Sequence, residues 1–116
     1  MRASFPLPFD YIEDMERQAC MKPSDVLEKN RGLVRDIVSR RQLSNPRVYG
    51  SVLRGEDKPD SDLDILVDPS ATTTLLTLGG VEWELEEALG VPVDVKVPGD
   101  FPADVRGRIL AEALAI

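Results

Sequence analysis

The run GSVLRGEDKPDSDLDILVD at residues 50–68 decides the fold of this chain. Its second part, DLDILV, alternates polar and apolar residues before it becomes fully apolar. Successive side chains of a strand point to opposite faces, so Asp62 and Asp64 share one face with Leu66. The other face carries only apolar side chains, which are Leu63, Ile65 and Val67. The run therefore predicts a strand that buries one face and presents two carboxylates on the other.

One helix is predicted before this strand in the sequence, and another is predicted after it. Apolar residues recur at helical spacing from a cap at Ser24 to about Arg41. They recur again over residues 75–89, where Gly79-Gly80 is a possible break and Gly90 is suited to end the helix. A mixture of long amphipathic helices and short strands is typical of an α/β or α+β domain.

Further strands and a closing helix complete this pattern. Strands are predicted at 47–49 and 91–97, because β-branched and alternating residues dominate both runs. A helix after Pro102 has its inward stripe at Val105, Ile109 and Ala113. We therefore expect one α/β (α+β) domain, in which helices cover a small mixed sheet.

Composition excludes several classes of protein. The chain has 116 residues, no histidine and one cysteine, so histidine-dependent triads, Cys/His zinc sites and internal disulfides are all ruled out. Its net charge of −7 argues against a broad contact with double-stranded nucleic acid. No apolar run is long enough to span a membrane. We expect a soluble, cytoplasmic protein.

Three elements of the sequence point to phosphate chemistry. Gly50 and Ser51 directly follow a predicted strand and open a turn whose backbone N–H groups can bind a phosphate. Asp62 and Asp64, two positions apart on one strand face, can reach a pair of Mg²⁺ ions of the kind that assist nucleotidyl transfer. Asp94 lies on the polar face of the strand 91–97 and is the best candidate for a third metal carboxylate.

This combination of a Gly-Ser turn and an Asp-x-Asp strand resembles the polymerase-beta-type nucleotidyltransferase superfamily. The chain from Met21 onward resembles more narrowly the minimal nucleotidyltransferase (MNT) family, whose members are antitoxins of HEPN toxins in type VII toxin–antitoxin systems. The resemblance implies a three-stranded mixed sheet flanked by helices, ATP with two Mg²⁺ ions, and transfer of AMP to a hydroxyl of the partner, tyrosine being expected. It implies a hetero-oligomer with the toxin.

The resemblance also assigns roles to residues and boundaries to domains. Gly50 and Ser51 match the nucleotide-phosphate turn, while Asp62, Asp64 and Asp94 match the metal ligands, with Asp94 as the expected base. It divides the chain into an N-terminal extension, residues 1–20, and a nucleotidyltransferase domain, residues 21–116. Leu53 departs from the family pattern, which commonly has alanine before the arginine of this turn.

Alternatives remain open at this stage. Arg54 is expected either to neutralise the triphosphate or to form a surface ion pair with Glu56 or Asp57. The protein is either a catalyst or a non-catalytic antitoxin that neutralises its toxin by binding and occlusion. Transfer to a small-molecule hydroxyl is a third possibility, although the chain has little room for a substrate domain. Glutamates at 82, 84, 86 and 87 predict an acidic patch around Trp83 that attracts a basic partner.

Overall fold

The computed structural model describes residues 21–116. The predicted extension, residues 1–20, and a short helix expected from Asp10 lie outside the described residues. The elements follow the order α2 (Pro23–Lys29), α3 (Arg31–Arg40), β1 (Ser44–Tyr49), β2 (Leu63–Asp68), α4 (Leu75–Leu89), β3 (Val93–Lys96), a 3₁₀ turn η2 (Pro98–Asp100), α5 (Ala103–Glu112) and β4 (Leu114–Ala115). Both classes of element mix along the chain, as the sequence predicts.

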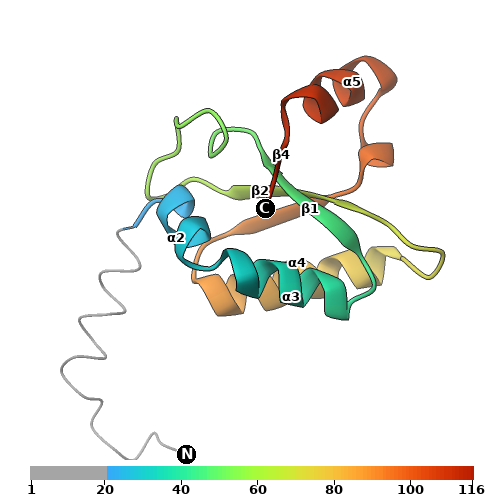
Figure 1. Cartoon of the computed structure of the whole chain (residues 1–116), viewed down its shortest axis with the longest axis horizontal. Coiled ribbons are helices and arrows are strands. Elements are labelled where there is room, and N and C mark those ends of the chain that lie inside the picture. Colours follow the sequence, from blue (N-terminus) through green and yellow to red (C-terminus); the bar gives the residue numbers. More distant parts are fainter. Residues whose placement is uncertain (1–20) are drawn as a thin grey trace, which may run out of the picture.

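The sheet has four strands in the order β3-β2-β1-β4, one more than the expected three (Figure 1). β2 pairs with β3 in parallel, whereas β1 is antiparallel to both β2 and β4. The parallel pair needs a crossover, and α4 supplies it. The mixed α+β architecture is therefore confirmed, and the strand that the sequence failed to predict is the short β4.

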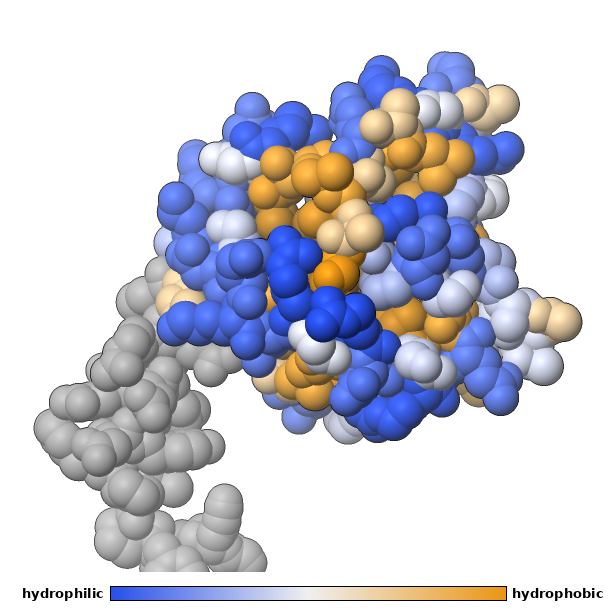
Figure 2. Space-filling model, viewed as in Figure 1, coloured by the Kyte–Doolittle hydropathy of each residue, from blue (hydrophilic) through white to orange (hydrophobic). Residues whose placement is uncertain are grey.

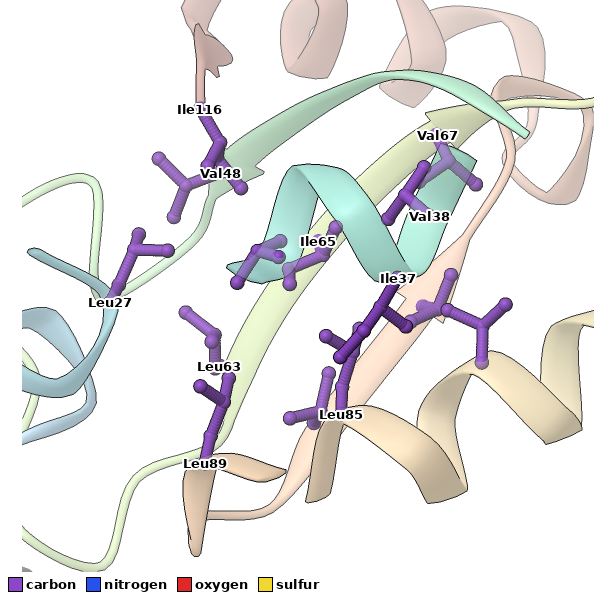
Figure 3. Close-up of a cluster of buried hydrophobic side chains, with 14 of the residues drawn as sticks. Leu27, Ile37, Val38, Val48, Leu63, Ile65, Val67, Leu85, Leu89 and Ile116 are labelled. Carbon is purple, nitrogen blue, oxygen red and sulfur yellow. The ribbon is translucent and has the colours of Figure 1, made fainter. Parts of the chain in front are cut away.

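A helix layer covers one face of the sheet and forms the core with it. α3 and α4 lie side by side beneath the strands (Figure 1). Side chains from both layers point toward one another in Figure 3. Ile37 and Val38 of α3 and Leu85 of α4 are almost completely buried, as are Leu63 and Ile65 of β2. The face of β2 that was predicted to be apolar is thus the core face.

Several helix predictions need correction. The helix expected from Ser24 to Arg41 is two helices, which separate at Asn30. Pro23, at the first position of α2, begins the helix where Ser24 was expected to cap it. α4 runs without a break through its two glycines and ends at Gly90, whose φ of 75° is left-handed as expected.

α5 does not join the core. The expected inward stripe of Val105, Ile109 and Ala113 is the less exposed side of the segment, but these residues are only half-buried and none of α5 is fully buried. Instead α5 lies on the opposite side of the sheet from α3 and α4 (Figure 1). The Arg106 side chain holds it there, because Nε donates to Pro98 O at 2.9 Å and Nη2 donates to Phe101 O at 2.8 Å. The sheet is thus packed on one face and partly open on the other.

The glutamates of α4 are mostly engaged within the fold. Glu82 Oε2 accepts a hydrogen bond from Val95 N at 2.9 Å, and Glu86 Oε2 accepts one from Val93 N at 3.0 Å. Glu84 forms ion pairs with Arg40 and Arg41. Three of the four glutamates predicted to attract a partner therefore already have partners. Within residues 21–116, none of the helices has the length and apolar character that crossing a membrane requires.

Candidate active site

A row of three side chains crosses the open face of the sheet. Tyr49 of β1 is directly opposite Asp64 of β2, and Asp64 is directly opposite Asp94 of β3. Residues opposite one another in neighbouring strands have side chains on the same face. The core-facing residues that flank them, such as Val48 and Val93, point the other way. The fold thus brings together Asp64 and Asp94, which the sequence assigned to the site from separate strands.

The turn after β1 fits closely against this row. Gly50 has a φ of +79°, and a Cβ on it would collide with Asp64 Oδ2. Only glycine tolerates both that backbone conformation and that contact. The sequence predicts that Gly50 permits close approach of a phosphate. The structure adds a second reason, because the carboxylate of Asp64 already occupies the space beside it.

The turn itself is short and irregular. Arg54 N donates to Gly50 O at 3.1 Å, and Glu56 N donates to Ser51 O at 2.9 Å. Residues 50–55 therefore form a turn, as the sequence predicts. Ser51 is partly exposed beside Gly50, where an incoming anion can reach it.

Asp64 has an unusual electrostatic environment. Burial is the largest cause that raises its pKa to about 6, and the negative charges of Asp94 and Asp62 raise it further. Lys96 and Arg54 act in the opposite direction but more weakly. Each cause works by making the ionised carboxylate less favourable. Asp64 is thus a carboxylate whose charge the protein alone does not fully compensate.

Asp62 and Arg54 lie at the margin of the site. Asp62 is exposed and immediately precedes β2, near enough to influence Asp64 electrostatically. Arg54 forms an ion pair with Glu56, Nε to Oε1 at 2.9 Å, in which both side chains are more than half exposed. This is one of the two alternatives that the sequence left open. Because exposed pairs are weak, Arg54 remains available to a stronger anion.

Lys96 is a site residue that the sequence analysis did not single out. Its Nζ donates to Asp94 Oδ1 at 3.2 Å, and this hydrogen bond is the first cause that raises the pKa of Lys96. The strand alternation that places Asp94 on the open face also places Lys96 there, two positions later. The alternation of side chains along this strand could therefore have predicted Lys96 as a site residue.

Tyr49 is the second residue that was missed. It is buried, and its ring meets Phe101 edge to face with 5.9 Å between the ring centroids. Burial is the main cause that raises the pKa of Tyr49, and Asp64, Asp94 and Asp100 add to it. The phenol therefore stays neutral. Tyr49 and Phe101 together form an aromatic wall beside the carboxylates.

Asp57 holds the loop after the turn in place. It is only 5% exposed, and its Oδ2 accepts a hydrogen bond from Ser24 N at 2.9 Å. Ser24 lies in the first turn of α2, where backbone N–H groups have no partner within the helix. Asp57 therefore fastens the loop to α2. It was considered only as an ion-pair partner for Arg54, which the structure does not bear out.

The carboxylates suit a hard cation. Among residues 21–116, no three carboxylate or thiolate side chains lie close enough together to form a complete metal site. Mg²⁺ in nucleotide sites, however, takes only one or two carboxylates and completes its shell with phosphate oxygens and water. Asp64 and Asp94 supply those oxygens, and the raised pKa of Asp64 indicates negative charge that a cation would offset. The donor set therefore fits Mg²⁺ bound together with a nucleotide.

Comparison with known proteins identifies sequences and folds that are similar to this chain. Residues 31–116 match the family model described as "Nucleotidyltransferase domain". Protein adenylyltransferase MntA of Thermococcus cleftensis is 38% identical over 69 residues, which cover 60% of this chain and 70% of that protein. The residues that match the family model include all three strands that carry Tyr49, Asp64 and Asp94.

Solved structures show the same fold. A minimal nucleotidyltransferase structure superposes with a TM-score of 0.73 at 35% identity, covering 80% of this chain and 95% of that one. A toxin–antitoxin crystal structure with AMP-PNP gives a TM-score of 0.61 at 17% identity, covering 80% of this chain and 71% of that one. The second likeness is a likeness of fold alone.

Proposed function

Because this chain belongs to the nucleotidyltransferase-domain family, and is by homology a protein adenylyltransferase, we propose that it is the antitoxin of a HEPN/MNT (type VII) pair. It transfers AMP from ATP to a hydroxyl, expected to be a tyrosine, of its cognate HEPN ribonuclease toxin, and so silences the toxin. The relative named MntA and the toxin–antitoxin structure with AMP-PNP support this assignment. The two proteins form a hetero-oligomer in the cytoplasm.

The observation that carries the proposal is the juxtaposition of Asp64, Asp94 and the turn at Gly50. In the proposed reaction, the acceptor oxygen attacks the α-phosphorus of ATP. The bond from that phosphorus to the bridging oxygen breaks, and pyrophosphate leaves. Asp94 accepts the hydroxyl proton, while the backbone at Gly50 and Ser51 hydrogen-bonds the phosphates. Positioning and charge neutralisation account for most of the rate.

The remaining site residues have supporting roles. Asp62, Asp64 and Asp94 would hold two Mg²⁺ ions together with the phosphates, and these ions would supply charge neutralisation at the α-phosphate. Arg54 would exchange its weak pair with Glu56 for a phosphate oxygen. Tyr49 stays neutral and, with Phe101, limits the access of water to the carboxylates.

Intact-mass spectrometry of the toxin tests the proposal. The toxin co-expressed with this chain should gain the mass of one or more AMP groups, and tandem spectrometry should place them on a hydroxyl side chain. An Asp64→Asn chain should leave the toxin unmodified at matched expression, because the charge that faces the metal is lost at nearly constant volume. An unmodified toxin beside the wild-type chain would overturn the proposal.

Metal dependence provides a separate prediction. ATP should bind tightly only with Mg²⁺, because Asp64 and Asp94 otherwise repel the triphosphate. Isothermal titration calorimetry with and without a chelator measures this difference. Equal ATP affinity in both conditions would contradict the assignment of these two carboxylates as metal ligands.

Occlusion is distinguished from catalysis by stoichiometry. A catalyst protects at less than one copy per toxin and leaves a covalent mark, whereas an occluding partner needs at least one copy per toxin. The Asp64→Asn chain is again the diagnostic variant. If it protects cells as well as the wild-type chain at matched expression, neutralisation by binding is the function.

A further inference from the structure

Lys96 forms an ion pair with Asp94 inside the candidate active site. Its Nζ donates to Asp94 Oδ1 at 3.2 Å, and the two side chains are 39% and 37% exposed. Both residues lie on β3, two positions apart, so both side chains are on the open face of the sheet. The proposed function assigns metal binding and proton transfer to Asp94. A lysine therefore already contacts an oxygen that the reaction needs.

The register of the sheet places Lys96 beside the carboxylates and away from the phosphate turn. Asp64 is opposite Asp94, and Leu66 is opposite Lys96 at the next position on the same face. β1 runs in the other direction and reaches Gly50 only after the position opposite Asp64. Lys96 and the turn at Gly50 therefore flank the pair of carboxylates from opposite ends.

The charge of Lys96 acts on both carboxylates. Burial and the neighbouring aspartates raise the pKa of Asp64, and Lys96 is the first of the charges that lower it. Asp100 and Glu82 also lie near Lys96, but each accepts a hydrogen bond from a backbone N–H close to Lys96 in the chain. Lys96 is thus a counter-charge that the chain itself supplies to Asp94 and Asp64.

We propose that Lys96 competes with the metal for Asp94 and that ATP releases it. This inference rests on the proposed function, because it takes Asp64 and Asp94 to be metal ligands. Lys96 must leave Asp94 Oδ1 before a cation can take its place. A phosphate group bound between the turn and the carboxylates offers the ammonium group another anion, and the four-carbon stem of lysine is flexible enough to follow it. Lys96 is therefore a positioning residue, which reserves Asp94 for a metal that arrives with nucleotide.

Binding of Mn²⁺ alone tests the competition. Mn²⁺ suits the same carboxylate ligands as Mg²⁺, and electron paramagnetic resonance measures the free ion without ATP or toxin. Lys96→Met removes the charge and nearly preserves the length of the side chain. This variant should bind Mn²⁺ about fivefold more tightly than wild type, which is the strength of a good exposed ion pair. Lys96→Arg keeps the charge and should stay within about twofold of wild type.

Two further variants locate the effect. Lys29→Met causes the same change in net charge, but Lys29 is exposed on α2, which packs into the core on the other face of the sheet. Figure 2 shows mainly hydrophilic residues on the side of the molecule where α2 lies. The Mn²⁺ affinity of this control should change less than about twofold, because solvent and salt screen a distant charge. The double variant Lys96→Met/Asp64→Asn should lose the gain, since the metal then lacks a carboxylate.

ATP tests the release of Lys96. Calorimetry gives the factor by which Mg²⁺ tightens ATP binding, and the same factor describes how ATP tightens metal binding. This factor should be about fivefold smaller in Lys96→Met than in wild type, because the variant has no ammonium group to release from Asp94. An unchanged factor would overturn the release by ATP.

The outcomes separate this inference from the proposed function. Equal Mn²⁺ affinity of Lys96→Met and wild type would overturn the competition, as would an equal gain in Lys96→Arg or Lys29→Met. A gain that persists in the double variant with Asp64→Asn would place the metal elsewhere and overturn it as well. None of these measurements needs toxin or AMP transfer. If the toxin stays unmodified beside the wild-type chain, the proposed function fails, while the metal titrations still decide what Lys96 does.

Discussion

Asp64 is a single residue whose ionisation makes the stability of the chain depend on pH. Its pKa in the folded chain is about 6, against 3.8 for an ordinary aspartate. The folded state therefore binds this proton more tightly than the unfolded state does. The contribution of Asp64 to the free energy of unfolding is highest below pH 3.8, falls as the pH rises toward 6, and stays low above 6.

Replacing this carboxylate should stabilise the chain. The side chain of Asp64→Asn cannot ionise. In the absence of metal, the free energy of unfolding of this variant should therefore exceed that of wild type by about 1–2 kcal/mol near pH 7, after discounting for solvent that reaches the side chain. The difference in free energy of unfolding between the variant and wild type should disappear below about pH 4. Urea titrations at several pH values in chelator test this. A less stable Asp64→Asn at pH 7 would show that the negative cluster is compensated by other groups.

Gly50 has a close counterpart in Gly55. Both have left-handed φ angles, +79° and +71°, but a Cβ at Gly55 would meet nothing within 4 Å. Gly55→Ala should cost only the backbone strain, about 1–2 kcal/mol. Gly50→Ala should cost clearly more and should abolish AMP transfer, because its methyl group displaces Asp64. Equal losses of stability in thermal unfolding would mean that the contact with Asp64 relaxes easily.

Single residues also show where sequence reasoning was sufficient. Asp64 and Asp94 were assigned to one site because strand alternation fixes which face each carboxylate occupies. Tyr49 and Lys96 follow the same alternation and were missed because neither belongs to a recognised motif. Asp57 could not be foreseen, since its role depends on the placement of α2, which is far away in the sequence.

At the scale of elements, Asp57 fastens the loop between the turn and β2 to α2. Asp57→Ala should lower the free energy of unfolding by about 1–3 kcal/mol, because the N–H of Ser24 loses its buried acceptor. Asp60→Ala, in the exposed part of the same loop, should change stability by less than about 0.5 kcal/mol. Chemical denaturation of both variants measures the difference. Similar small effects would show that water replaces the carboxylate.

Elements in which apolar residues recur at a regular spacing were predictable, and short elements or elements without such a spacing were not. The strand at 63–68 and the helix at 75–89 are long enough for their apolar residues to fix both type and burial. β4 has two residues and no period, so its pairing with β1 is decided by tertiary contacts alone. The stripe of α5 shows a related limit, because a helical period indicates which side of the helix faces inward but not whether a core lies beneath it.

At the scale of the whole molecule, the net charge of −7 should govern encounter with a basic toxin. The association rate should fall as salt rises, since the Debye length shrinks from about 10 Å at 0.1 M to about 3 Å at 1 M. The dissociation rate should change less. Stopped-flow mixing at several salt concentrations measures both. An association rate that is independent of salt would mean that the docking contact is purely apolar.

The row of Tyr49, Asp64 and Asp94 has a consequence for the life of the protein in the cell. Its members come from three strands, and the parallel partner β3 is synthesised only after α4. During translation the row is therefore absent until β3 has emerged, and on the proposed mechanism a product that is truncated before Asp94 is inactive. The same holds for degradation. A protease that unravels any one of these strands separates the members of the row, so the proposed site is lost as a unit.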